Sequence, residues 1–92
     1  MIRIAIADDH AIVRQGLRQI LAAHGDFEVI GEAANHGEVM QLLRKETFDV
    51  LLLDIAMPGK NGIDTLKQVR LERPKLPVLM LSMETSGADR GY

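Results

Sequence analysis

Short apolar runs alternate with longer amphipathic segments along the chain. The runs are rich in aliphatic residues and bounded by polar or turn residues, which is typical of β-strands. They span 3–7, 27–34, 49–54 and 77–82. Between them, apolar residues recur at helical spacing over 10–24, from 36 to about 47, and from 63 to about 73. The pattern therefore predicts the order β-α-β-α-β-α-β.

Several residues mark the ends of these elements. Gly25 follows the first predicted helix as a stop signal, and Pro74 requires the third helix to end near Arg73. Asn35 with Glu38 three residues later forms a capping-box pattern at the second helix. Residues 57–62 have turn chemistry, and 83–92 show no periodicity. We expect one domain over 1–83, followed by an irregular tail over 84–92.

The run at 49–54 is continuously apolar rather than alternating, as expected of a strand that is covered on both faces of a parallel sheet. Alternating strands and helices favour a doubly wound α/β fold with right-handed crossovers. We expect a flavodoxin-like sheet with strand order 2-1-3-4. In such folds, sites lie at the carboxyl ends of the strands, where the strand order reverses.

Composition narrows the class of protein. With 47% hydrophobic and 26% charged residues the chain is typical of a globular domain, and no apolar run reaches the ~18 residues of a membrane span. There is no cysteine, and the net charge of −2 provides no overall attraction to nucleic acid. The basic residues Lys67, Arg70, Arg73 and Lys75 are expected to form a solvated face. We expect a soluble cytoplasmic domain without nucleic-acid or membrane contact.

Acidic residues end two strands that should be neighbours in this sheet. Asp8 and Asp9 follow the first strand and Asp54 ends the third, while Ser82 ends the fourth. Carboxylates crowded in one crevice favour a hard cation such as Mg²⁺. A carboxylate in such a site can also accept a phosphoryl group. Asp54 is the better candidate for that role, because the buried strand before it fixes its position.

Simpler roles for these residues remain open at this point. A single aspartate after a strand is commonly a turn former or a helix cap. Asp9 could cap the first helix, and His10 is expected to begin that helix rather than to bind a metal.

Four segments resemble a known family. They are IAIADDH at 4–10, VRQGL at 13–17, LDIAMPGKNG at 53–62 and PVLMLSM at 77–83. In this order they resemble the CheY-like receiver domain of two-component response regulators, and most closely the NarL/FixJ (LuxR-type) subfamily. The resemblance covers residues 2–83.

The resemblance implies roles for particular residues. Asp54 matches the phosphoacceptor that takes a phosphoryl group from a histidine kinase. Asp8 and Asp9 match the acidic pair that binds Mg²⁺, with Asp9 and Asp54 as direct ligands and the backbone carbonyl of Ala56 as the third protein ligand. Ser82 matches the hydroxyl that binds a phosphoryl oxygen and moves on activation. The loop after the acceptor would be shaped by Pro58 and Gly62.

The sequence also departs from the family pattern. Receivers continue with a further helix, a fifth strand that carries a lysine, and a fifth helix, whereas Lys75 is the last lysine here. We therefore expect an incomplete receiver with no phosphate-pairing lysine and no DNA-binding domain. An uncovered fourth strand would present an edge for self-association or element exchange.

Two other functions stay open. A truncated receiver could act as a phosphorylation-independent interaction module. A Mg²⁺ phosphohydrolase of the haloacid-dehalogenase type is disfavoured, because Ala56 stands where such enzymes have a second aspartate. We expect a signalling domain rather than an enzyme, with only self-phosphorylation from a donor and slow self-dephosphorylation.

Overall fold

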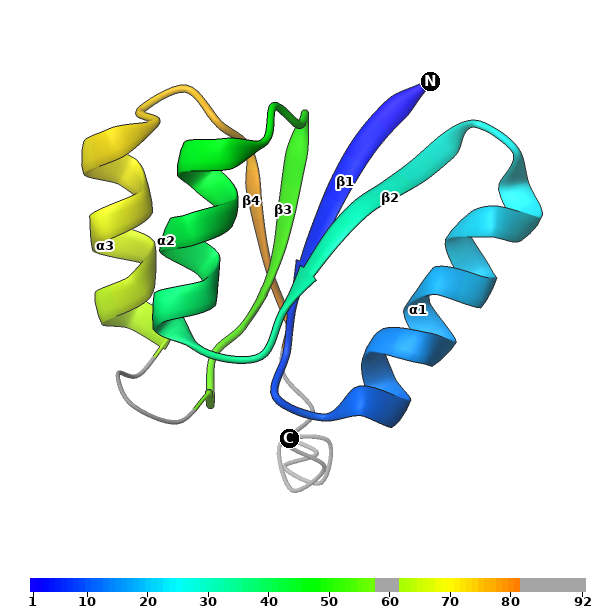
Figure 1. Ribbon diagram of the computed structural model, residues 1–92, viewed down its shortest axis with the longest axis horizontal. Coiled ribbons are helices and arrows are strands. Elements are labelled where there is room, and N and C mark those ends of the chain that lie inside the picture. Colours follow the sequence, from blue (N-terminus) through cyan, green and yellow to red (C-terminus); the bar gives the residue numbers. More distant parts are fainter. Residues whose placement is uncertain (58–61, 82–92) are drawn as a thin grey trace, which may run out of the picture.

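The computed structural model describes residues 1–57 and 62–81, which form a parallel sheet between two layers of helices (Figure 1). The elements are β1 Ile2–Ala7, α1 Ala11–His24, β2 Phe27–Ala33, α2 His36–Lys45, β3 Val50–Asp54, α3 Gly62–Glu72 and β4 Val78–Leu81. The strand order β2-β1-β3-β4 confirms the predicted topology. None of the described helices is long and apolar enough to cross a membrane.

The two faces of the sheet have different apolar cores. Helices α2 and α3 cover one face and α1 lies on the other (Figure 1). Alternate residues of β1 and β3 point to opposite faces, because side chains alternate along a strand. The larger core includes Ala5, Ala7, Leu51 and Leu53, whereas Ile4, Ile6 and Leu52 form the smaller core with Leu17 and Leu21 of α1. The continuous apolar run in β3 therefore reflects burial on both faces, as predicted.

The predicted helix ends are confirmed. Gly25 ends α1 in the left-handed region, at φ 76°, where glycine has no steric penalty. The side chain of Asn35 accepts a hydrogen bond of 2.9 Å from the backbone N–H of Glu38. The Glu38 carboxylate in turn accepts one of 2.7 Å from the N–H of Ala34, one residue before the cap. This reciprocal pattern satisfies two backbone donors where β2 gives way to α2.

The sheet register brings the acidic residues of two strands to one edge. Ala7 of β1 pairs with Leu53 of β3, so Asp8, directly after β1, and Asp54, the last residue of β3, lie side by side. Leu81 of β4 pairs with Asp54 at the same level. The predicted clustering thus follows from pairing, because parallel strands end at a common edge. Ser82, Pro58 and the tail over 84–92 lie outside the described residues.

The expectation of a solvated basic face is wrong for Arg73. Its guanidinium donates hydrogen bonds to the backbone carbonyls of Leu43 and Glu46 and lies 5.4 Å from the ring centroid of Phe48. Arg73 therefore joins the end of α3 to the last turn of α2. The sequence pattern missed this contact because the partners lie about thirty positions earlier in the chain.

Candidate functional site

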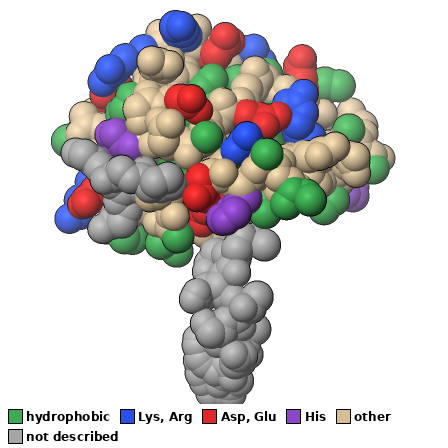
Figure 2. Space-filling model, turned by 60° about the horizontal axis from the view of Figure 1, so that its bottom comes forward, with side chains coloured by type: hydrophobic (Ala, Val, Ile, Leu, Met, Phe, Trp, Pro, Cys, Tyr) green, Lys and Arg blue, Asp and Glu red, His purple; other side chains and the backbone are tan. Residues whose placement is uncertain are grey.

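Three carboxylates and one imidazole converge at the carboxyl edge of the sheet. Asp8, Asp9, His10 and Asp54 each offer one ligand atom, and these atoms lie within 4.8 Å of one another. Asp8 is 0% exposed and Asp54 2% exposed, whereas His10 is exposed. Figure 2 brings this edge forward and shows acidic side chains beside a histidine in the lower part of the face, about midway across it. Two negative groups are therefore buried close together.

The surroundings of Asp8 leave one carboxylate oxygen unpaired. Its backbone N–H donates to the carbonyl of Ala33 at 2.9 Å. Its Oδ1 accepts from the backbone N–H of His10 at 2.8 Å and lies 3.0 Å from His10 Nδ1. Its Oδ2 is buried without a hydrogen-bond partner. Because an unpaired buried carboxylate oxygen is energetically costly, this atom is suited to a cation.

Asp54 ends β3 in a similar local turn. Its Oδ1 accepts a hydrogen bond of 3.2 Å from the backbone N–H of Ala56. Burial raises the pKa of the Asp54 carboxyl, and the charges of Asp8 and Asp9 raise it further. The Ala56 N–H and His10 partly oppose that rise. A bound cation would favour the ionised carboxylate, which is the nucleophilic form.

His10 lies closer to the carboxylates than its predicted role suggests. It is the N-cap of α1, as expected, but its Nδ1 also lies 3.1 Å from Asp9 Oδ1. That contact has ion-pair distance without hydrogen-bond geometry, so the buried Asp9 Oδ1 accepts no hydrogen bond. The hydrogen bond to Asp8, followed by the charge of Asp9, raises the pKa of His10. The alternative in which Asp9 caps α1 is wrong, because no side chain caps this helix.

The start of α3 packs directly against the peptide that follows Asp54. The backbone N–H of Gly62 donates to the carbonyl of Ile55 at 2.6 Å. A Cβ at position 62 would lie 2.4 Å from the Ile55 Cα, so only glycine fits without displacement of backbone. Met57, two residues after Ile55, is buried in the larger core. The residues that follow Asp54 are thus held by two contacts, Ile55 against the start of α3 and Met57 in the larger core.

The described residues fit a magnesium ion. Mg²⁺ prefers oxygen ligands and is commonly bound through one or two carboxylates with waters. Asp8 and Asp9 each contribute a buried oxygen without a hydrogen bond, and Asp54 lies beside them. The structure places Ala56 two residues after Asp54, with its N–H turned to that carboxylate. Its carbonyl as a third ligand stays a prediction.

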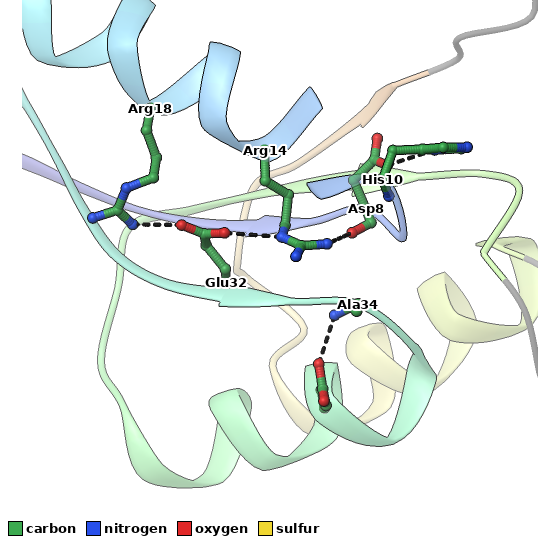
Figure 3. A network of polar contacts seen from close by, with 7 residues as sticks. Asp8, His10, Arg14, Arg18, Glu32 and Ala34 are labelled. Carbon is green, nitrogen blue, oxygen red and sulfur yellow. Dashed lines mark hydrogen bonds and ion pairs between the residues drawn. The ribbon is translucent and has the colours of Figure 1, made fainter. Parts of the chain in front are cut away.

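The sequence interpretation did not identify a cationic contact to this edge. The Arg14 guanidinium donates to the backbone carbonyl of Asp8, and its Nε donates to Glu32 Oε1 at 2.8 Å (Figure 3). Arg14 lies in the VRQGL segment, so the resemblance pointed to its position without a role. Glu32 is eighteen positions away on β2, and the packing of α1 against β2 brings it within reach.

Comparison with known proteins identifies the family. The sequence model of the response regulator receiver domain matches residues 4–91. The transcriptional regulatory protein LiaR of Bacillus subtilis is 44% identical over 81 residues, which are 86% of this chain and 38% of LiaR. The nitrate/nitrite response regulator protein NarP of Escherichia coli is 32% identical over 87 residues, 95% of this chain and 40% of NarP. The chain thus spans about two fifths of the length of these relatives.

Solved structures agree with this assignment. A LuxR-family two-component response regulator from Aurantimonas has a TM-score of 0.86 at 32% identity, covering 98% of this chain and 66% of that one. RcsB from Salmonella enterica, solved on promoter rprA with the phosphomimetic BeF3−, has a TM-score of 0.84 at 33% identity, covering 89% of this chain and 42% of RcsB. The sequence match shows, and the strand order and acidic edge agree, that the chain belongs to the response regulator receiver domain family.

Proposed function

We propose that the chain is a phosphoacceptor domain in which Asp54 takes a phosphoryl group from a histidine kinase in the presence of Mg²⁺. The observation that carries this proposal is the position of the buried Asp54 carboxylate beside that of Asp8. The Asp8 Oδ2 is buried and has no hydrogen-bond partner. A carboxylate nucleophile beside a carboxylate oxygen that is free to bind a cation suits metal-assisted phosphoryl transfer.

The proposed transfer is a nucleophilic displacement at phosphorus by the Asp54 carboxylate. A carboxylate oxygen attacks the phosphorus of the donor phosphohistidine, a P–O bond forms, and the P–N bond breaks with its electron pair left on the imidazole. The β3 strand and the Ala56 N–H orient the carboxylate for this attack. Bound Mg²⁺ would offset the negative charge of the three carboxylates and the incoming phosphoryl group. Asp8 and Asp9 would hold the ion.

The wider function is proposed from the relatives. LiaR and NarP are named as regulators, and RcsB was solved on promoter DNA with a phosphomimetic group. By analogy, phosphorylation here would control transcription through a separate DNA-binding domain, and this chain would not contact DNA itself. Ser82 as the phosphoryl-binding hydroxyl and a cytoplasmic location stay predictions.

Self-association through β4 also stays a prediction. Val78–Leu81 form the outer strand of the described sheet, and Leu79 is 58% exposed. Size-exclusion chromatography with light scattering measures the mass in solution. A folded monomer at high protein concentration would contradict it.

Phosphorylation by a small-molecule phosphodonor with Mg²⁺, followed by intact mass measurement, tests the main proposal. We expect the wild-type chain to gain one phosphoryl group and Asp54→Asn to gain none. Asp26→Asn is the matched control, because Asp26 is exposed in the turn before β2 and should leave the gain unchanged. No gain in a folded wild-type chain that binds Mg²⁺, or an undiminished gain in Asp54→Asn, would contradict the proposal. The first result would favour the interaction-module alternative.

A further inference from the structure

A chain of charged side chains links α1 and β2 to the backbone of Asp8. Arg14 lies between the Asp8 carbonyl and the carboxylate of Glu32, and donates to both (Figure 3). Glu32 holds a second cation, because its Oε2 accepts from Arg18 Nη1 at 2.7 Å. The Arg14 side chain is 18% exposed, whereas that of Arg18 is 47% exposed. Of these two arginines, Arg14 is the one that reaches the acidic edge.

The carbonyl that Arg14 holds belongs to the peptide joining Asp8 to Asp9. Rotation of this peptide would change the direction in which Asp9 leaves the backbone, since a peptide group moves as a rigid plane. The N–H of Asp8 is fixed separately by the Ala33 carbonyl at 2.9 Å. Both sides of Asp8 are therefore tied to neighbouring elements, and Arg14 supplies the tie on the side of Asp9.

We propose that Arg14, oriented by Glu32, is a positioning residue that fixes the relative orientation of the Asp8 and Asp9 carboxylates for a divalent cation. This inference rests on the proposed function, because it takes the acidic edge to be a Mg²⁺ site. Arg14 acts through the backbone and not as a ligand. Groups that orient metal ligands commonly change metal affinity by about 10–100-fold when they are removed.

The charge of Arg14 and its positioning act on Mg²⁺ binding in opposite directions. A guanidinium near the site repels a divalent cation, so loss of its charge alone would strengthen binding. Loss of the hydrogen bond frees the peptide between the two carboxylates and weakens binding. The direction of the change in Arg14→Met therefore separates the two effects. Arg14→Lys keeps the charge but cannot supply the two-sided contact, because an ammonium is a compact point donor.

Isothermal titration calorimetry with MgCl₂ on the 92-residue chain tests the inference. We expect Arg14→Met and Arg14→Lys to weaken Mg²⁺ binding by about 10-fold. Arg18→Met is the matched control within the same network, since it removes a cation from Glu32 without touching Asp8. Arg44→Met is a distant control at an exposed ion pair with Glu72. Neither control should weaken binding.

Thermal unfolding without Mg²⁺ distinguishes positioning from a merely structural role. If the Arg14 variants unfold at lower temperature but bind Mg²⁺ as tightly as wild type, or more tightly, the inference is overturned while the proposed function stands. If Arg14→Met does not fold, Arg14→Lys decides by the same criterion. If the wild-type protein does not bind Mg²⁺, the proposed function is overturned, and the inference about Arg14 falls with it.

Discussion

The acidic groups at the two ends of the sheet differ in whether they have partners within the chain. At the amino end, the Asp49 carboxylate accepts a backbone hydrogen bond of 2.8 Å from Arg3, and Glu72 pairs with Arg44 at 2.6 Å. At the carboxyl end, Asp8 and Asp54 are buried together, and the Asp8 Oδ2 has no partner.

The pKa shifts follow the same division. The hydrogen bond from Arg44 lowers the pKa of Glu72, whereas burial raises the pKa of Asp54. The amino end is thus satisfied by groups within the chain, while the carboxyl end has an excess of buried negative charge. This difference fits a stabilising role for the amino end. It also fits the proposal that the carboxyl end binds a cation from solution.

Gly62→Ala should have the largest effect. The new Cβ would overlap the Ile55 backbone, so the peptide after Asp54 or α3 must shift, at a cost of about 3 kcal/mol in unfolding free energy. We expect phosphorylation of Asp54 to be lost or strongly slowed, as measured by intact mass over time. Gly16→Ala is the matched control, because nothing lies within 4 Å of its Cβ position. That control should stabilise α1 by about 0.5–1 kcal/mol and leave phosphorylation intact.

The second largest effect on the unfolding free energy should come from Mg²⁺ binding at the carboxyl end. At about 100 times its dissociation constant, a ligand of the folded state adds about 2.7 kcal/mol to the unfolding free energy. Asp54→Asn should be more stable than wild type without Mg²⁺, because it removes a buried charge, and should gain less from the ion. Urea unfolding with and without MgCl₂ measures both effects. Equal stabilisation of wild type and Asp54→Asn would argue against an ion beside Asp54.

Arg73→Met should weaken the amino end alone. The substitution removes the donor from two backbone carbonyls at the end of α2, and we expect a loss of about 2 kcal/mol in urea unfolding. Mg²⁺ affinity should stay within experimental error of wild type. Weaker Mg²⁺ binding in this variant would show that the two ends of the sheet are energetically coupled.

The dependence of stability on pH should carry opposite signs at the two ends. Because the pKa of Glu72 is lowered in the fold, its contribution is present above its unfolded pKa and is lost as pH falls through the lower, folded value. Because the pKa of Asp54 is raised, the penalty for its buried charge is relieved as pH falls from the folded value to the unfolded one.

Unfolding of metal-free Asp54→Asn and Glu72→Gln across acidic pH measures these two contributions. Relative to wild type, Asp54→Asn should show a stability that falls more steeply with acid, since it lacks the relief. Glu72→Gln should fall less steeply, and its effect is expected to be the smallest because the Arg44 pair is solvent-exposed. The same slope in both variants would contradict the assignment of opposite shifts.

The order of elements could be read from the sequence because it depends on local periodicity. The apolar run in β3, the stop at Gly25 and the Asn35 cap are all signals within a few residues, and each agrees with the structure. The gathering of Asp8 and Asp54 was also predictable. Parallel strands in a doubly wound sheet must end at one edge, so two strand-ending aspartates on neighbouring strands have little freedom to lie apart.

Tertiary structure alone decided which polar atoms of that edge have hydrogen-bond partners. The unpaired Oδ2 of Asp8, the position of His10 between two carboxylates and the contact from Arg14 to the Asp8 carbonyl have no periodic signature. The Arg73 contacts to the end of α2 were likewise hidden. Periodicity reports which face of an element is buried, whereas a long side chain reaches partners that are set by how separate elements pack. The sequence by itself therefore determined the fold and the acidic edge, and packing decided how that edge is held and what it leaves open.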